Sequence, residues 1–239
     1  MSHTPITPSA PGTPLSDRTV GEIVSEHPNL SRVFQAYAIG FCCQGKLTLR
    51  DACARHNVAV EEMITALEQE LEGADAPLEN PANLPLQELT AYIVERHHAF
   101  LRRELPRIHA MAERVAHVHG GHTPSLVEIY EVFTEMGQEL AEHAQKEEQV
   151  LFPLIAQLED DTANSDLCAP VKRLIQEHAA TNASLAKLRE LTNGYQPPVD
   201  ACNTYRALFA GLADLETDTW QHIHLENNIL FPRALERAG

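Results

Sequence analysis

The sequence lacks the features that mark membrane, nucleic-acid-binding and β-rich proteins. Its hydrophobic residues, 44% of the chain, never form an apolar run long enough to cross a bilayer, which predicts no membrane contact. Only 18 residues are lysine or arginine against 34 aspartates and glutamates, and a net charge of -16 repels nucleic-acid phosphates. No segment shows the alternating pattern of a strand. The composition therefore predicts an acidic helical protein that binds neither membranes nor nucleic acid.

The N-terminal residues also lack the apolar core of a signal peptide. Residues 1–16, "MSHTPITPSAPGTPLS", are rich in proline and are predicted to form a flexible tail. The 5 cysteines are odd in number and show no disulfide framework, which predicts reduced thiols and a cytoplasmic location. These cysteines are Cys42, Cys43, Cys53, Cys168 and Cys202.

Apolar residues recur at helical spacing along almost the whole chain. Residues 17–72 predict several short helices that form a small domain, and residues 73–85, which are poor in pattern, predict a linker. Residues 86–239 hold four long periodic segments, at 86–119, 125–158, 167–192 and 201–236. Four helices joined by three short turns predict an up-down-up-down bundle. The expected fold is therefore all-α, with a four-helix bundle preceded by a small helical domain.

One motif occurs twice in the predicted bundle. "HAQKEEQVLFP" begins at His143 and "HIHLENNILFP" begins at His222, so both contain H-x-x-x-E-x-x-x-L-F-P. Helix geometry places each histidine and the following glutamate on one face, about 6 Å apart along the axis, and the apolar stripes through them point inward. For one such pair, a buried hydrogen bond between histidine and glutamate is the simpler interpretation. Two equivalent copies favour a metal site, because buried charged groups need a partner.

The first and third predicted helices each place one more histidine on the inward face. His98 shares its stripe with Leu101, and His178 shares one with Leu174 and Leu185. When residues of adjacent antiparallel helices are paired about their turns, both histidines reach the height of the repeated motif. The sequence therefore predicts a dinuclear metal site. Its six ligands are His98, His143, Glu147, His178, His222 and Glu226.

Three other histidines are predicted to lie outside this site. His97 and His224 fall off the inward stripes and are expected at the surface or as supporting groups. His119 shares the stripe of His98 but lies about 30 Å away along a straight helix, too far to bind the same metal.

The ligand types favour iron over zinc. Two carboxylates placed between imidazoles suit two iron ions that are bridged by the carboxylates and a solvent-derived oxygen. Zinc needs only four ligands in a tetrahedron, fewer than the six that converge here. A set rich in imidazole should favour ferrous iron and small ligands, of which nitric oxide and dioxygen are the obvious ones.

A second motif, "GFCCQGK" at residues 40–46, places two cysteines side by side. Adjacent cysteines can bond to each other only through a strained ring, and the flanking glycines offer little to bury them. Lys46 can lower the pKa of a nearby thiol. Burial as small packing residues is the alternative, but the pattern favours Cys42 and Cys43 as reactive or iron-contacting thiols. The cysteines predicted to serve only in packing are Cys53, Cys168 and Cys202.

The two motifs together resemble the Repair of Iron Centers family, also called the YtfE/ScdA/DnrN/NorA proteins. These are hemerythrin-like bundles with an N-terminal double-cysteine domain, and the resemblance covers roughly residues 17–238. It implies a cytosolic non-haem protein of the nitrosative and oxidative stress response. It also implies an oxo- or hydroxo-bridged di-iron centre bound by the six ligands above, with Glu147 and Glu226 as bridges.

The resemblance further implies a function in binding or reducing nitric oxide and in repairing damaged iron-sulfur clusters. The expected partners are nitric oxide or dioxygen, iron-sulfur client proteins and an electron donor. The alternative is a hemerythrin-like module that stores, scavenges or senses a gas without turnover. The sequence leaves open whether the chain is an enzyme that reduces nitric oxide or repairs clusters, and it leaves the oligomeric state open.

Overall fold

A computed structural model describes residues 12–72, 80–158 and 167–238 of the chain. These residues are mostly helical, and among them no strand occurs beyond an isolated bridge between Thr19 and Thr48. The all-α prediction is therefore confirmed. Most of the predicted N-terminal tail, the first part of the linker at 73–85 and the turn after residue 158 lie outside the described residues. Within the described ranges, no helix is both long and apolar enough to cross a membrane.

The chain divides into two compact units that cut across the predicted segment 86–239. The first unit contains residues 1–92, 154–168 and 220–239, and the second contains residues 93–153 and 169–219. Helix α10, Asn203–His224, belongs to the second unit up to Thr219 and to the first unit from Trp220. The predicted domain boundaries remain predictions.

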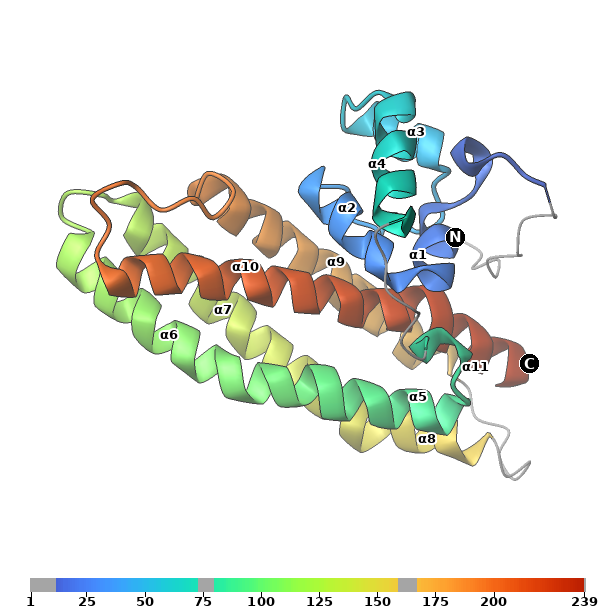
Figure 1. Cartoon of the computed structure of the whole chain (residues 1–239). Coiled ribbons are helices and arrows are strands. Elements are labelled where there is room, and N and C mark those ends of the chain that lie inside the picture. Colours follow the sequence, from blue (N-terminus) through green and yellow to red (C-terminus); the bar gives the residue numbers. More distant parts are fainter. Residues whose placement is uncertain (1–11, 73–79, 159–166, 239) are drawn as a thin grey trace. The chain divides into compact units, whose positions relative to one another are not determined.

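The second unit is an antiparallel four-helix bundle (Figure 1). Its first helix is the π-helical turn η4, Val94–His98, followed by α6, Ala99–His119. The second is α7, Ser125–Lys146, which continues into the π-helical turn η5, Glu147–Leu151. The third and fourth are α9, Cys168–Leu191, and α10.

Contacts between the four helices establish their directions. Along the first helix, His98 lies beside Glu147 of the second, whereas Leu105, farther along, lies beside Gly137, which comes before Glu147 in the chain. Against the fourth helix, His97 lies beside Asp218, whereas Ile108 lies beside the earlier residue Gly211. On the other side of the bundle, Lys187 of α9 forms an ion pair with Glu128 of α7 at 2.6 Å. Residue numbers therefore rise along one helix as they fall along its neighbour, which confirms the predicted up-down-up-down order.

The core of the bundle consists of the apolar stripes that the sequence predicts. Burial of these side chains stabilises the fold by roughly 25 cal/mol for each Å² of apolar surface removed from water. Fully or almost fully buried members include Leu101, Ile108, Val115, Leu126, Ile129, Phe133, Met136, Leu140, Val171, Leu174, Leu185, Leu188, Leu208, Leu212 and Leu215.

The first unit contains short helices from the N-terminal part of the chain together with the C-terminal end. The short helices are α1 (Val20–Glu26), α2 (Ser31–Ala36), α3 (Leu49–Arg55), α4 (Val60–Glu72) and α5 (Leu86–Ile93, whose last residue lies in the second unit). Later segments of the chain complete the unit, and these are α8 (Phe152–Gln157, in this unit from Leu154), the π-helical turn η6 (Leu225–Leu230) and α11 (Phe231–Ala238). Helices α1 and α3 begin where Thr19 and Thr48 accept hydrogen bonds from the backbone N–H groups of Glu22 and Asp51.

Candidate metal centre

In the second unit, two imidazoles and one carboxylate converge inside the bundle. The Nε2 atoms of His143 and His178 lie 2.9 Å apart, and His143 Nε2 lies 3.3 Å from Glu147 Oε1. Each of the three residues offers one ligand atom, and these atoms all lie within 4.8 Å of one another. All three side chains are buried. Nitrogen and oxygen ligands at this spacing can bind one metal ion between them.

Glu147 also faces a third imidazole. Its Oε2 atom lies 3.3 Å from His98 Nε2, whereas its Oε1 atom faces His143. One carboxylate therefore places an oxygen toward each of two histidines from different helices. This is the arrangement that a carboxylate bridging two metal ions requires.

Two further carboxylates hold the outer nitrogens of these imidazoles. His98 Nδ1 lies 2.8 Å from Glu148 Oε1, and His143 Nδ1 lies 2.9 Å from Glu177 Oε2. An imidazole that donates its Nδ1–H to a carboxylate directs the lone pair of Nε2 at the metal, and the carboxylate makes that nitrogen a stronger ligand. Both histidines are therefore oriented for metal binding by residues outside the predicted ligand set.

Both supporting carboxylates are ionised. Burial alone would raise the pKa of Glu177, but hydrogen bonds from Lys146 and His143 outweigh it and lower the pKa to about 2. The pKa of Glu148 is lowered in the same way, since hydrogen bonds from Arg102 and His98 outweigh the effect of burial. The sequence analysis missed both residues. The available signal was their position, because Glu148 directly follows Glu147 and Glu177 directly precedes His178.

The donor set fits a metal such as iron. Three imidazoles and a carboxylate are the ligands that iron accepts in non-haem sites. A cluster of this kind is costly to bury without a cation, because the carboxylate must leave water. The ring of Phe152, from the repeated L-F-P, stacks on His98 with centroids 5.7 Å apart.

In the first unit, the second copy of the motif forms a pair of its own. His222 Nε2 lies 2.9 Å from Glu226 Oε1, and both side chains are buried. As the motif predicts, the two lie on one face of the continuous helix formed by α10 and η6. That this pair joins the other four residues in a single centre remains a prediction from helical register.

Of the two alternatives predicted for His97 and His224, a surface position is wrong, because both are buried, whereas a supporting role remains a prediction. In the second unit, His97 Nδ1 lies 3.1 Å from Asp218 Oδ1. His97 and His98 both belong to the π-helical turn η4, whose wider turn changes the phase of the helix. A stripe drawn at 3.6 residues per turn therefore misplaces one of them.

His224 is buried for a different reason. In the first unit, its ring contacts Phe41, its Nδ1 lies 3.0 Å from Asn228 Nδ2, and its Nε2 lies 3.4 Å from Ser25 Oγ. Burial lowers the pKa of His224 to about 3, so the ring is neutral. The periodicity of one helix cannot reveal a segment from elsewhere in the chain that covers its outer face.

That segment is the double-cysteine loop, residues 40–46. Asn228 Nδ2 lies 3.4 Å from the carbonyl oxygen of Phe41 and 3.3 Å from that of Cys42, which also lies 3.3 Å from Asn227 Nδ2. A Cβ atom on Gly45 would lie 2.3 Å from Asn228 Oδ1, so a larger residue there would displace the Asn228 amide. The loop is therefore held closely on the residues that follow Glu226.

The structure separates the cysteines that the sequence grouped. Cys42 is only 1% exposed, which contradicts the expectation that the flanking glycines leave both thiols uncovered, whereas Cys43 is exposed. Cys53 is buried, as expected of a packing residue, and burial raises the pKa of its thiol. Cys168 and Cys202 are exposed, so the prediction that they serve in packing is wrong.

His119, which the sequence excludes as a ligand, lies at the C-terminal end of α6 in the second unit. Its Nε2 atom lies 3.4 Å from Cys202 Sγ, and its ring centroid lies 5.9 Å from that of Tyr205. Cys202 directly precedes α10 and Tyr205 lies in its first turn, whereas His98 lies 21 residues earlier than His119 in the first helix.

Comparisons with known proteins agree with this arrangement. The family model for the hemerythrin HHE cation binding domain matches residues 89–234, and the ScdA_N model, described as a domain of unknown function, matches residues 16–71. The chain is 39% identical to the iron-sulfur cluster repair protein YtfE of Edwardsiella ictaluri, over 92% of this chain and 97% of the relative. The YtfE protein of Pectobacterium atrosepticum is 36% identical over the same shares. The chain therefore belongs to the hemerythrin HHE family, in the group of YtfE proteins that carry an N-terminal ScdA_N domain.

Proposed function

We propose that this protein holds a di-iron centre and supports the repair of damaged iron-sulfur clusters, with nitric oxide as a small ligand of the centre. The relatives named for iron-sulfur cluster repair, which align with 92% of the chain, support the repair function. The buried histidines and carboxylates support the metal centre. The proposed iron ligands are His98, His143, Glu147, His178, His222 and Glu226.

The position of Glu147 is the observation that carries this proposal. Its two oxygens each lie 3.3 Å from a different imidazole nitrogen, of His98 and of His143. A single metal ion would not require a carboxylate shared in this way, whereas two ions do. In the proposal, Glu226 is the second bridge and His222 binds beside it.

The surrounding residues have defined tasks in this proposal. Glu148 and Glu177 hold the Nδ1 protons of His98 and His143, so each Nε2 lone pair points at the metal. Phe152 covers the His98 ring and keeps water from the ligands. When bound, the iron pair supplies redox-active ferrous ions that accept small ligands such as nitric oxide.

The cysteines are assigned different tasks. Cys43 is exposed, so its thiol can meet a client protein or an electron donor. Cys42 is buried under the contacts from Asn227 and Asn228, so its principal contribution is to the position of the loop. The repair function therefore depends on Cys43 more than on Cys42.

Reactivation of a damaged client protein tests the proposal. A dehydratase whose [4Fe–4S] cluster has been damaged with nitric oxide is incubated anaerobically with the iron-loaded protein, and its activity is followed. We expect activity to return with the iron-loaded protein and not with the Glu147→Ala variant. Equal recovery with the metal-depleted protein would overturn the proposal.

A second measurement separates turnover from gas binding. The reduced protein is exposed to nitric oxide with excess reductant, and nitrous oxide in the headspace is measured by gas chromatography. Many equivalents per chain would show reduction, whereas nitric oxide uptake without nitrous oxide would show a binding module.

A further inference from the structure

The two copies of the motif use the same helix face in different ways. The face in question is the one that contacts the double-cysteine loop in the second copy. Its residues lie at positions −6, −2, +1 and +2 from Glu226, and they are Trp220, His224, Asn227 and Asn228. In the first unit this face is covered by the double-cysteine loop. The Phe41 ring lies 5.8 Å from the Trp220 ring and 5.5 Å from the His224 ring, and the two asparagine amides contact loop carbonyls.

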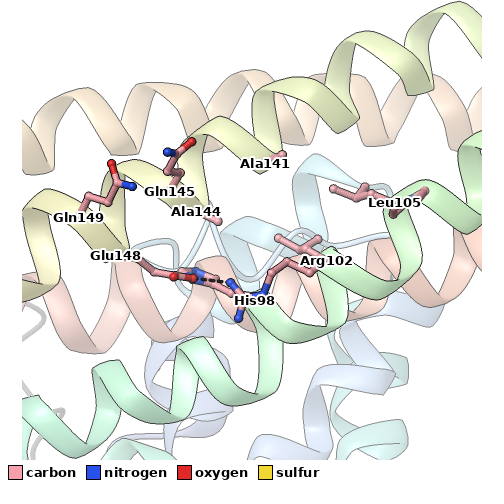
Figure 2. Close-up of a pocket in the computed structure, with 10 residues that line it drawn as sticks. His98, Arg102, Leu105, Ala141, Ala144, Gln145, Glu148 and Gln149 are labelled. Atoms are coloured by element: carbon pink, nitrogen blue, oxygen red, sulfur yellow. Dashed lines mark hydrogen bonds and ion pairs between the residues drawn. The ribbon is translucent and has the colours of Figure 1, made fainter.

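In the second unit, the same face of the first copy lines an open pocket. The residues at −6, −2, +1 and +2 from Glu147 are Ala141, Gln145, Glu148 and Gln149, and all four line a cavity of about 330 Å³ (Figure 2). Ala144, at −3, also lines it. Ala141 occupies the position that corresponds to Trp220, so part of the pocket lies where the second copy has an indole ring.

The other wall of the pocket comes from the first helix of the bundle. It consists of His98, Leu101, Arg102, Leu105 and Pro106. The leucines and the proline are apolar, whereas Arg102 donates to Glu148 at 2.6 Å, which neutralises both charges. Pro106 lies inside α6 and has no N–H, so the carbonyl of Arg102 lacks its helical donor. The pocket thus combines apolar walls with hydrogen-bonding groups and little net charge.

We propose that this pocket binds an extended, cysteine-containing loop of an iron-sulfur client protein, in the way that its counterpart holds residues 40–46. This inference rests on the proposed repair function. An aromatic or other apolar side chain of the client loop fills the space beside Ala141, between the walls of Leu101 and Leu105. The amide of Gln149 donates to a backbone carbonyl of that loop, as its counterpart Asn228 does in the second copy. Gln145, at the position of His224, offers a second amide donor.

One lining residue explains why such a loop would bind here. His98 lines the pocket and is both a proposed iron ligand and the hydrogen-bond partner of Glu148 (Figure 2). A client loop in the pocket would bring the cysteines of a damaged cluster close to one ligand of the iron centre. The ion pair in the pocket favours a neutral segment, and the chain's net charge of -16 disfavours an acidic one.

A peptide-binding experiment tests this inference on the full-length, iron-loaded protein. The probe is a fluorescently labelled synthetic peptide with the sequence of residues 38–47, AIGFCCQGKL, kept anaerobic and reduced. We expect saturable binding in fluorescence anisotropy. The variant Ala141→Trp fills the space that the apolar side chain of the probe would occupy, and it should therefore weaken binding at least about tenfold. Gln149→Ala should weaken it less, because one donor is lost.

Two controls make the result specific. Ala110→Trp adds the same side chain at another exposed alanine, outside the pocket, and should leave binding unchanged. A probe with serine in place of its phenylalanine should bind more weakly. The absence of saturable binding, or binding that Ala141→Trp does not change, would overturn the inference. Iron content and cluster repair are measured on the wild-type protein and on the same variants, so absence of repair by the iron-loaded wild-type protein, with peptide binding intact, would contradict the proposed function instead.

Discussion

The two copies of H-x-x-x-E-x-x-x-L-F-P place the same pair of side chains in different surroundings. In the first copy, Glu147 faces the imidazoles of both His98 and His143, and the next residue, Glu148, supports His98. In the second copy, Glu226 contacts His222, and the next two residues contact the double-cysteine loop. The motif thus places a histidine and a glutamate on the buried side of each helix, whereas the residues just after the glutamate differ in what they contact.

The largest expected effect comes from removing either motif glutamate. Glu147→Ala and Glu226→Ala should each lower bound iron from about two ions to fewer than about one per chain, because each removes a proposed bridge between the ions. His97→Ala and His224→Ala should retain iron, although both sites are buried. Metal analysis of the four purified variants checks this. If Glu226→Ala keeps its iron, the two copies are not equivalent.

Removing a supporting carboxylate should have the next largest effect. Glu148→Ala and Glu177→Ala should each weaken iron binding by roughly 10- to 100-fold, because His98 or His143 loses the partner that orients its ring. Glu148→Gln should recover part of the loss, since the amide oxygen can still accept from Nδ1. Competition with an iron chelator gives the affinities. Affinities equal to wild type would show that these contacts do not orient the ligands.

The packing of the loop on the second copy can be loosened by a single methyl group. Gly45→Ala places Cβ 2.3 Å from Asn228 Oδ1 and should displace the amide that contacts the carbonyls of Phe41 and Cys42. Gly40→Ala has space, since its nearest atom is 4.0 Å away. We expect alkylation of buried Cys42 to rise roughly tenfold in the first variant only, as about 1.4 kcal/mol of lost packing would give. Mass spectrometry of protein treated with iodoacetamide measures it. Equal rates in both variants would contradict the described packing.

The smallest expected effects are those of replacing Cys42 or Cys43, and they differ between the two residues. Cys43→Ser should leave the free energy of unfolding unchanged and lower cluster repair, because an exposed thiol contributes little to packing. Cys42→Ser should cost about 1 kcal/mol of stability, because it buries a hydroxyl in place of a thiol. Both should keep normal iron content. Denaturant unfolding and repair are measured on the same preparations, and full repair by a folded Cys43→Ser variant would remove that thiol from the function.

Several features of the site follow from the sequence. The 3.6-residue period predicted the all-α bundle, and the six proposed ligands on its inward stripes are all buried. This was possible because burial on a regular helix repeats with a fixed period. Because the motif occurs twice, the sequence also favoured one metal site over two separate histidine–glutamate hydrogen bonds.

The rest depends on contacts that periodicity does not encode. His97 is buried because a π-helical turn changes the helical phase, and His224 is buried because a segment some 180 residues earlier covers it. Glu148 and Glu177 support imidazoles on other helices, so their roles require the packing of three helices. The burial of Cys42 likewise depends on two asparagines far along the chain.

Iron stoichiometry with Mössbauer spectroscopy tests the central claim most directly. The protein is loaded anaerobically with ⁵⁷Fe, freed of excess metal and oxidised. The account predicts about two irons per chain with the spectrum of a magnetically coupled ferric pair, because Glu147, shared between two imidazoles, and Glu226 are proposed to bridge two ions. One iron per chain with an uncoupled spectrum would contradict it.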